Sequence, residues 1–231
     1  MQRPSVVVFD VNETLSDMAP MGRRFAAVGA AEPLAKLWFA SLLRDGFALT
    51  AAGGQEAFAS LGRNVLRTLL TPLHKSGQLD RGVDEAIEHI MAGFGELPVH
   101  ADVADGVRAL REVGMRLVTL TNGAVTVPQG LFERAGIVRE FERLMSVEDA
   151  GVWKPARGAY EYAARTCGVD MGDMLLVAVH PWDIDGAARA GMRTAWIDRA
   201  GSPYPAHFAA PDITARGITD LAARLAGAAG P

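Results

Sequence analysis

The sequence predicts an α/β fold: a doubly wound parallel sheet with helices on both faces and an all-helical cap inserted after the first strand. Short, continuously apolar runs recur along the chain, a pattern typical of strands buried on both faces of a parallel sheet. Segments of helical periodicity separate these runs, so strands and helices alternate. The stretch 17–97 interrupts the alternation because it contains helical patterns only.

The first predicted strand is Val6–Phe9, which ends directly before Asp10. The later strands are predicted at Leu117–Leu120, Leu144–Val147, Leu175–Val179 and Thr194–Ile197. The helices of this part are predicted at Val103–Val113, Val127–Ala135, Ala156–Cys167 and Ile184–Ala190. A glycine follows each of these helices, where the left-handed position after a helix favours that residue type. We therefore assign residues 1–16 and 98–231 to one core domain.

The inserted stretch 17–97 is predicted to form a helical cap domain over the sheet. Its helices are expected at Met21–Val28, Pro33–Arg44, Gly54–Leu70 and Val83–Phe94, separated by glycine and proline. After Ile213 the chain is rich in alanine and ends in Gly-Ala-Ala-Gly-Pro, which predicts a last helix that frays.

Composition limits the classes of function. A chain of 231 residues can form one core domain with a smaller inserted domain. A net charge of -4 gives no excess of basic residues, so we expect no nucleic-acid partner. No segment has the roughly 20 apolar residues that cross a bilayer, so no membrane partner is expected. The single cysteine, Cys167, and an N-terminal apolar run too short for a signal peptide predict a cytoplasmic protein.

Polar residues follow the apolar runs at the points where the strands should end. They are Asp10 after the first strand, Thr121 and Asn122 after the second, Lys154 beyond the third, and His180 with Asp183 after the fourth. Ligands of open parallel sheets bind at the carboxyl ends of the strands, so we expect these side chains to converge. Each also has an ordinary structural interpretation, as a helix cap or a loop residue.

Four segments together resemble the motifs of the haloacid dehalogenase superfamily. They are Phe9–Leu15 (FDVNETL), Leu120–Gly123 (LTNG), Lys154-Pro155, and His180–Asp183 (HPWD) followed by Gly186–Gly191. All four occur in the superfamily's order and span nearly the whole chain. The resemblance implies a Rossmann-like core with a helical cap after the first strand, in agreement with the pattern of elements.

The resemblance also implies the roles of individual residues. Asp10 would attack the substrate and form a covalent ester that water then hydrolyses. Lys154 would keep this carboxylate ionised, because an opposite charge lowers its pKa. Asp183 would orient or deprotonate the water, and Thr14 is expected to belong to the catalytic group. The predicted substrate-binding residues are Val11, Asn12, Thr121, Asn122, Tyr160, His180 and Trp182, together with Phe39 and Arg44 of the cap.

Two positions favour dehalogenation over phosphate transfer. Phosphatases of the superfamily carry a general acid where this chain has Asn12, and a magnesium-binding acid where it has Val179. We therefore expect no metal and no cofactor. The resemblance is to type II (L-)2-haloacid dehalogenases, which implies a carbon–halide hydrolase acting on a haloacetate or a 2-halopropionate. The alternatives are a phosphatase or phosphonatase, and a catalytically silent member that binds a small acid or a protein partner.

The sequence departs from that subgroup where the halide should bind. The better-known L-2-haloacid enzymes present an arginine from a cap helix, but the matching place here holds Phe39, and Arg44 is the nearby alternative. They also have an aromatic residue in place of Asn12 and an asparagine in place of His180. His180 could donate to the departing halide or to the substrate carboxylate. Because subgroup members often pair, a homodimer is a reasonable expectation for the assembly.

Overall fold

The computed structural model describes residues 4–227 of the chain. The chain divides into two compact units, one of Met1–Ser16 with Val99–Pro231 and the other of Asp17–Pro98. Each unit has its own secondary structure, and each is described by itself below. Within residues 4–227, no helix combines the length and apolarity needed to span a membrane.

The first unit contains a six-stranded, fully parallel sheet in the order β3-β2-β1-β4-β5-β6. The strands are β1 (Val6–Phe9), β2 (Arg116–Thr121), β3 (Arg143–Ser146), β4 (Met174–Ala178), β5 (Arg193–Ile197) and β6 (Ile213–Ala215). In the centre of the sheet, Val8 is paired with Val118 on one side and with Leu176 on the other. All four side chains of β1 are fully buried, as continuous apolarity predicted. The predicted α/β fold class is confirmed.

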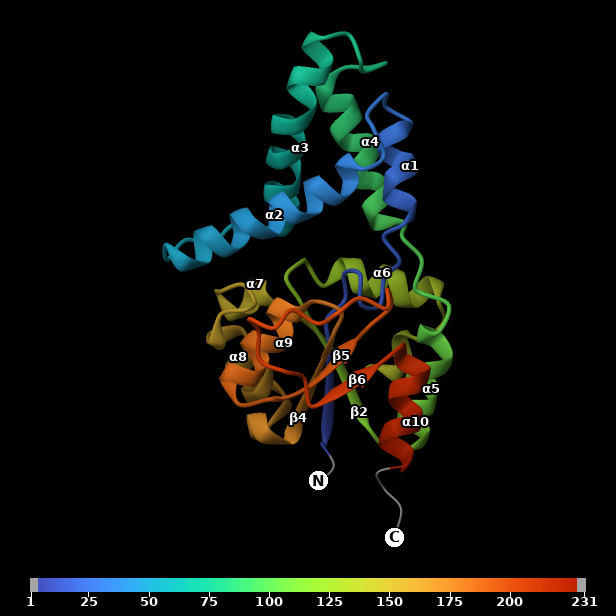
Figure 1. Cartoon of the computed structure of the whole chain (residues 1–231), viewed down its shortest axis with the longest axis vertical. Coiled ribbons are helices and arrows are strands. Elements are labelled where there is room, and N and C mark those ends of the chain that lie inside the picture. Colours follow the sequence, from blue (N-terminus) through green and yellow to red (C-terminus); the bar gives the residue numbers. More distant parts are fainter. Residues whose placement is uncertain (1–3, 228–231) are drawn as a thin grey trace. The chain divides into compact units, whose positions relative to one another are not determined.

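Helices cover both faces of this sheet. They are α5 (Val103–Glu112), α6 (Thr126–Arg134), α7 (Val147–Ala150), α8 (Arg157–Cys167), α9 (Pro181–Ala190) and α10 (Ile218–Gly227), with 3-10 turns η1 (Val138–Glu140) and η2 (Met171–Asp173). Figure 1 shows α5 and α10 side by side at one face, and α8 and α9 at the other. Helices α8 and α9 end at Gly168 and Gly191, which have φ values of 67° and 100°. Both glycines thus adopt the left-handed conformation that the sequence predicted.

Strand β6 is absent from the sequence prediction. It has only three residues and pairs with β5 alone at the edge of the sheet, so it lacks the long apolar run of a central strand. The last helix is α10, and the residues expected to fray, 228–231, lie outside the described part of the chain. Val147, predicted as the end of a strand, instead begins α7, because the Ser146 side chain accepts a hydrogen bond from Glu148 N and caps that helix.

The second unit consists of α1 (Pro20–Ala26), α2 (Leu34–Ala51), α3 (Phe58–Lys75) and α4 (Val83–Gly95). Its core is aromatic: the Trp38 ring lies 6.1 Å from that of Phe25 and 5.9 Å from that of Phe94. The indole N–H of Trp38 donates to Gly62 O at 3.0 Å, which joins α2 to α3. Helix α2 continues past its predicted end at Arg44 because a single interior glycine, Gly46, does not break an otherwise helical segment.

Candidate active site

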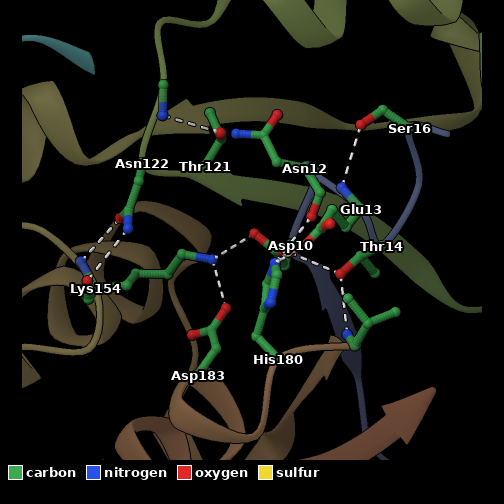
Figure 2. A network of polar contacts seen from close by, with 12 residues as sticks. Asp10, Asn12, Glu13, Thr14, Ser16, Thr121, Asn122, Lys154, His180 and Asp183 are labelled. Atoms are coloured by element: carbon green, nitrogen blue, oxygen red, sulfur yellow. Dashed lines mark hydrogen bonds and ion pairs between the residues drawn. The ribbon is translucent and has the colours of Figure 1, made fainter. Parts of the chain in front are cut away.

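Asp10 lies at the carboxyl end of β1, where the chain turns back on itself. Its backbone N–H still pairs with Val177 O of β4 at 3.0 Å, so the sheet fixes the position of Asp10. The following residues form a tight loop in which Leu15 N and Ser16 N both donate to the carbonyl of Val11. This loop returns the Thr14 hydroxyl to Asp10, to which it donates at 2.6 Å (Figure 2).

The direction of the Thr14 hydroxyl is set by a second hydrogen bond. Val179 N donates to Thr14 Oγ1 at 3.0 Å, so the oxygen is already an acceptor there. The single hydroxyl hydrogen is therefore directed to Asp10 Oδ2. Thr14 thus holds one carboxylate oxygen of Asp10, and Val179, the residue directly after β4, in turn holds Thr14.

Lys154 connects two buried carboxylates. Its ammonium donates to Asp10 Oδ1 at 2.9 Å and to Asp183 Oδ2 at 2.6 Å, and its side chain is fully buried (Figure 2). The side chain of Asn122 fixes the Lys154 backbone, because it accepts from Lys154 N at 2.9 Å and donates to Lys154 O at 3.2 Å. Asn122, the residue after β2, thereby positions the Lys154 ammonium next to Asp10 at the end of β1.

Asp183 lies in the first turn of α9 and is also bonded to Tyr160 of α8. The Tyr160 hydroxyl donates to Asp183 Oδ1 at 2.6 Å. Burial, with the charge of Asp183 beside it, raises the pKa of Tyr160 well above its ordinary value, so the hydroxyl keeps its proton. The two oxygens of Asp183 therefore each accept one strong hydrogen bond.

The two carboxyl groups are shifted in opposite directions. Burial alone raises the pKa of Asp10, but the charges of Lys154 and His180 and the hydrogen bonds from Thr14 and Lys154 outweigh it and lower that pKa. For Asp183, burial is again the largest influence, and with the negative charge of Asp10 it raises the pKa in spite of Lys154. The pKa of Lys154 is raised because its two carboxylate partners outweigh its own burial. The site therefore favours an ionised Asp10 and a more basic Asp183.

His180 and Trp182 form a stacked pair at the start of α9. Their ring centroids lie 5.0 Å apart with an interplanar angle of 19°. His180 Nε2 is 3.1 Å from the carbonyl oxygen of Asn12. The Trp182 ring centroid is 5.9 Å from the Lys154 ammonium, within the range of a cation–π interaction. This pair therefore lies beside the ion pairs of Lys154.

The structure brings most of the residues predicted for the site to one edge of the sheet. Thr121 is buried there and its hydroxyl accepts from Gly123 N at 3.1 Å. Asn122 was predicted to bind substrate, which stays a prediction; in the structure its side chain holds the backbone of Lys154. Phe39 and Arg44 belong to the helical unit: Phe39 packs on Trp38 in its aromatic core, and Arg44 is exposed. Their roles toward substrate stay predictions.

One contributor to the site was missed from the sequence. Arg199 follows β5 and donates to the carbonyl of Thr14 at 2.8 Å and to the Asp102 carboxylate at 2.8 Å. It thus supports the loop that carries Thr14. The rule that located the other residues would have found it, because Arg199 lies just past the predicted strand Thr194–Ile197.

Replacing Gly186 with alanine is expected to disturb the packing of α9 against Pro155 and Tyr160. A Cβ at this position of α9 would lie 2.5 Å from the Pro155 Cβ and 2.7 Å from the Tyr160 hydroxyl oxygen. We expect a loss of about 1–3 kcal/mol in the free energy of unfolding, typical of overpacking, measured by urea denaturation. Gly172→Ala is the matched control, because no atom lies within 4 Å of the Cβ it would add. Equal stability of the two variants would contradict the close packing of Gly186 against Pro155 and Tyr160.

Comparison with known proteins identifies the family. The profile of the haloacid dehalogenase-like hydrolases matches residues 4–191. The chain belongs to this family. Asp10, Lys154 and Asp183 all lie within the matched segment of this haloacid dehalogenase-like hydrolase.

Several named proteins are similar to this haloacid dehalogenase-like hydrolase. Haloacetate dehalogenase H-2 of Moraxella sp. (strain B) is 36% identical over 113 residues, which are 49% of this chain and 50% of that protein. An (S)-2-haloacid dehalogenase of Pseudomonas putida is 27% identical over 217 residues, 93% of each chain. The crystal structure of the L-2-haloacid dehalogenase RSc1362 superposes with a TM-score of 0.89 at 28% identity, covering 97% of this chain and 100% of that one.

Proposed function

We propose that this protein is a metal-independent hydrolase that converts a short 2-haloalkanoic acid, such as a haloacetate or a 2-halopropionate, to the 2-hydroxy acid. The observation that carries the proposal is the buried group Asp10–Lys154–Asp183, in which one ammonium is bonded to both carboxylates. The names of the relatives, a haloacetate dehalogenase and (S)-2-haloacid dehalogenases, support the substrate class. The proposed partner is thus a small haloacid.

In the first step, a carboxylate oxygen of Asp10 attacks the carbon that bears the halogen. A carbon–oxygen bond forms, the carbon–halogen bond breaks, and the halide leaves with the bonding pair without needing a proton. The lowered pKa of Asp10 keeps the nucleophile ionised. Lys154 and Thr14 restrict its rotation, which favours a productive approach.

In the second step, water attacks the carbonyl carbon of the Asp10 ester. Asp183 is the base that we propose for this water, because its raised pKa makes it a better proton acceptor than an ordinary aspartate. Collapse of the tetrahedral intermediate restores the Asp10 carboxylate, and the alkoxide takes a proton as it leaves as the 2-hydroxy acid. One proton and one halide are released per substrate.

The donor set of the site supports a reaction without a divalent cation. The carboxylates of Asp10 and Asp183 already share the Lys154 ammonium. Val179, at the position where phosphatases of the superfamily carry an acid, offers no carboxylate, and its carbonyl accepts from the indole N–H of Trp196. A hard cation would therefore have to compete with an ammonium for a small number of oxygens.

The test is halide release from chloroacetate, 2-chloropropionate and their bromo and fluoro analogues in the presence of a chelator. Halide should appear with at least one of these acids, and added Mg²⁺ should not increase the rate. An aryl phosphate serves as the comparison substrate. Turnover of the phosphate only after magnesium is added, with every haloacid inert, would show that the protein is a phosphatase.

A further inference from the structure

The loop that carries Thr14 contains a strained residue. Glu13 has a φ of 61°, the left-handed conformation that a residue other than glycine adopts only at a cost in free energy. Such a conformation persists where contacts with the rest of the structure fix the backbone. The geometry of this loop decides where the Thr14 hydroxyl lies, and this hydroxyl donates to Asp10 Oδ2 at 2.6 Å. The alignment of the nucleophile therefore depends on what holds the loop.

Three consecutive carbonyls of the loop are held by residues far away in the sequence. His100 Nε2 lies 2.9 Å from Glu13 O, and His100 N donates to Leu15 O at 3.0 Å. Between these two contacts, the guanidinium of Arg199 donates to Thr14 O at 2.8 Å. Arg199 thus fixes the backbone of the residue whose hydroxyl meets the nucleophile.

Arg199 is itself held by a rigid partner. Its guanidinium donates to Asp102 Oδ1 at 2.8 Å, and Asp102 Oδ2 accepts from Ile218 N at 2.6 Å, at the start of α10. A Cβ added at Gly217 would lie 2.5 Å from Asp102 Oδ2, so this carboxylate has little room to move. Burial alone would raise the pKa of Asp102, but the hydrogen bonds from Arg199 and Ile218 outweigh it and lower that pKa. The ion pair therefore ties the loop to the first turn of α10.

We propose that Arg199 is a positioning residue for the nucleophile Asp10, and that it acts through Thr14. By holding Thr14 O, it keeps the strained loop in the geometry that brings the Thr14 hydroxyl to Asp10 Oδ2. Arg199 thus affects the reaction without contacting the substrate. This inference rests on the proposed function, because it assigns the aligned carboxylate to attack on a haloacid.

A purely structural role for Arg199 would have a different signature. Loss of a structural ion pair lowers the free energy of unfolding but leaves the kcat of the folded molecules unchanged. Loss of a positioning contact lowers kcat and changes KM little, because a misplaced oxygen raises the barrier without weakening the binding of the substrate. The two roles also differ in their dependence on Thr14, since only positioning requires its hydroxyl.

The experiment is a double-mutant cycle between Arg199→Gln and Thr14→Val, with kcat and KM measured for halide release from the haloacid that the protein turns over fastest. Arg199→Gln should lower kcat about tenfold or more and change KM by less than about twofold. In the Thr14→Val background the same substitution should lower kcat by less than about twofold, because the hydroxyl that it positions is already absent. Arg108→Gln replaces an exposed arginine of α5 that is paired with Asp105; it is the matched control and should keep both constants.

A second variant guards against loss of folding. Arg199→Lys keeps a cation opposite Asp102, but an ammonium on a shorter side chain does not present the planar pair of donors that joins Asp102 to Thr14 O. Its kcat should also fall, by less than that of Arg199→Gln, and this fall should likewise disappear in the Thr14→Val background. Urea denaturation of each variant separates a change in stability from a change in kcat.

A measurement without substrate tests the loop itself. Leu15 N and Ser16 N are bonded to Val11 O within the loop, so the exchange of these amides with heavy water reports its opening. Mass spectrometry of peptides should show faster exchange over residues 11–16 in both Arg199 variants. Exchange over α3, which belongs to the second unit, should not change.

The outcomes are distinct. The inference would be overturned by an unchanged kcat in a folded Arg199 variant, by equal losses of kcat with and without the Thr14 hydroxyl, or by unchanged exchange over residues 11–16. Failure of the proposed function has another signature, because the wild type would then release no halide from any haloacid. In that case, faster exchange in the variants would still support Arg199 as the anchor of the loop, and unchanged exchange would overturn both proposals.

Discussion

Halide release is expected to fall by on the order of 10⁴-fold or more when Asp10 is replaced with asparagine. The amide has nearly the shape of the carboxylate but is a far weaker nucleophile, so the covalent ester cannot form. The measurement is halide released from 2-chloropropionate by wild type and variant. Asp105→Asn, at a largely exposed position of α5, is the matched control and should retain activity.

Heavy-oxygen water extends this test to the chemical step. When water attacks the ester at the carbonyl carbon, its oxygen becomes part of the Asp10 side chain, and mass spectrometry of the peptide that contains Asp10 detects it. Direct attack of water on the substrate carbon would put the heavy oxygen in the 2-hydroxy acid alone. The second pattern, or persistent activity of Asp10→Asn, would exclude Asp10 as the nucleophile.

Lys154→Met is expected to damage both stability and catalysis. The substitution leaves the carboxylates of Asp10 and Asp183 buried without the ammonium that they share. Removing one partner of a buried ion pair typically costs about 3–5 kcal/mol, so we expect a decrease of this size in the free energy of unfolding at neutral pH. Urea denaturation measures it. Lys75→Met, at an exposed position near the end of α3, is the control and should change stability by less than about 1 kcal/mol.

The stability of Lys154→Met should also depend on pH, in a direction that follows from the pKa shifts of Asp10 and Asp183. In the wild type the pKa of Asp10 is lowered and that of Asp183 is raised. Asp10 therefore contributes stability at pH values above its pKa in the unfolded chain, and this contribution is lost as the pH falls. The contribution of Asp183 is instead lost as the pH rises. Without Lys154, burial and the charge of Asp10 raise the pKa of Asp183 further, and the largest influence that lowers the pKa of Asp10 is lost. The variant should then become more stable as the pH falls from about 7 to about 5. A decrease over that range would contradict the role of Lys154 as their common partner.

The central strand and the residues at its end could be predicted because the relevant information is local. Val6–Phe9 is continuously apolar, and Asp10 is the first polar residue after it. In a parallel sheet the carboxyl ends of the strands meet at one edge, so Asp10, Asn122 and His180 were expected near each other. The structure places all three there (Figure 2).

The division of work among these residues could not be predicted, because it depends on contacts distant in sequence. Asn122 offers the same amide whether it faces a ligand or the backbone of Lys154, and only the fold shows that it holds Lys154. The bond between Arg199 and the Thr14 carbonyl spans most of the chain. Strand β6 is too short for a periodic signal, and it is recognisable only from its pairing with β5.

The shared ammonium has a consequence for how the chain acquires its reactivity. Asp10, Lys154 and Asp183 come from widely separated segments, and the ammonium of Lys154 reaches both carboxylates only after those segments have joined around the sheet. In an unfolded or partly folded chain, residue 10 is an ordinary solvated aspartate of little nucleophilic strength. The protein therefore becomes reactive only when the sheet of the first unit has formed. Recovery of turnover during refolding should accordingly follow formation of the whole sheet rather than of any single helix or strand.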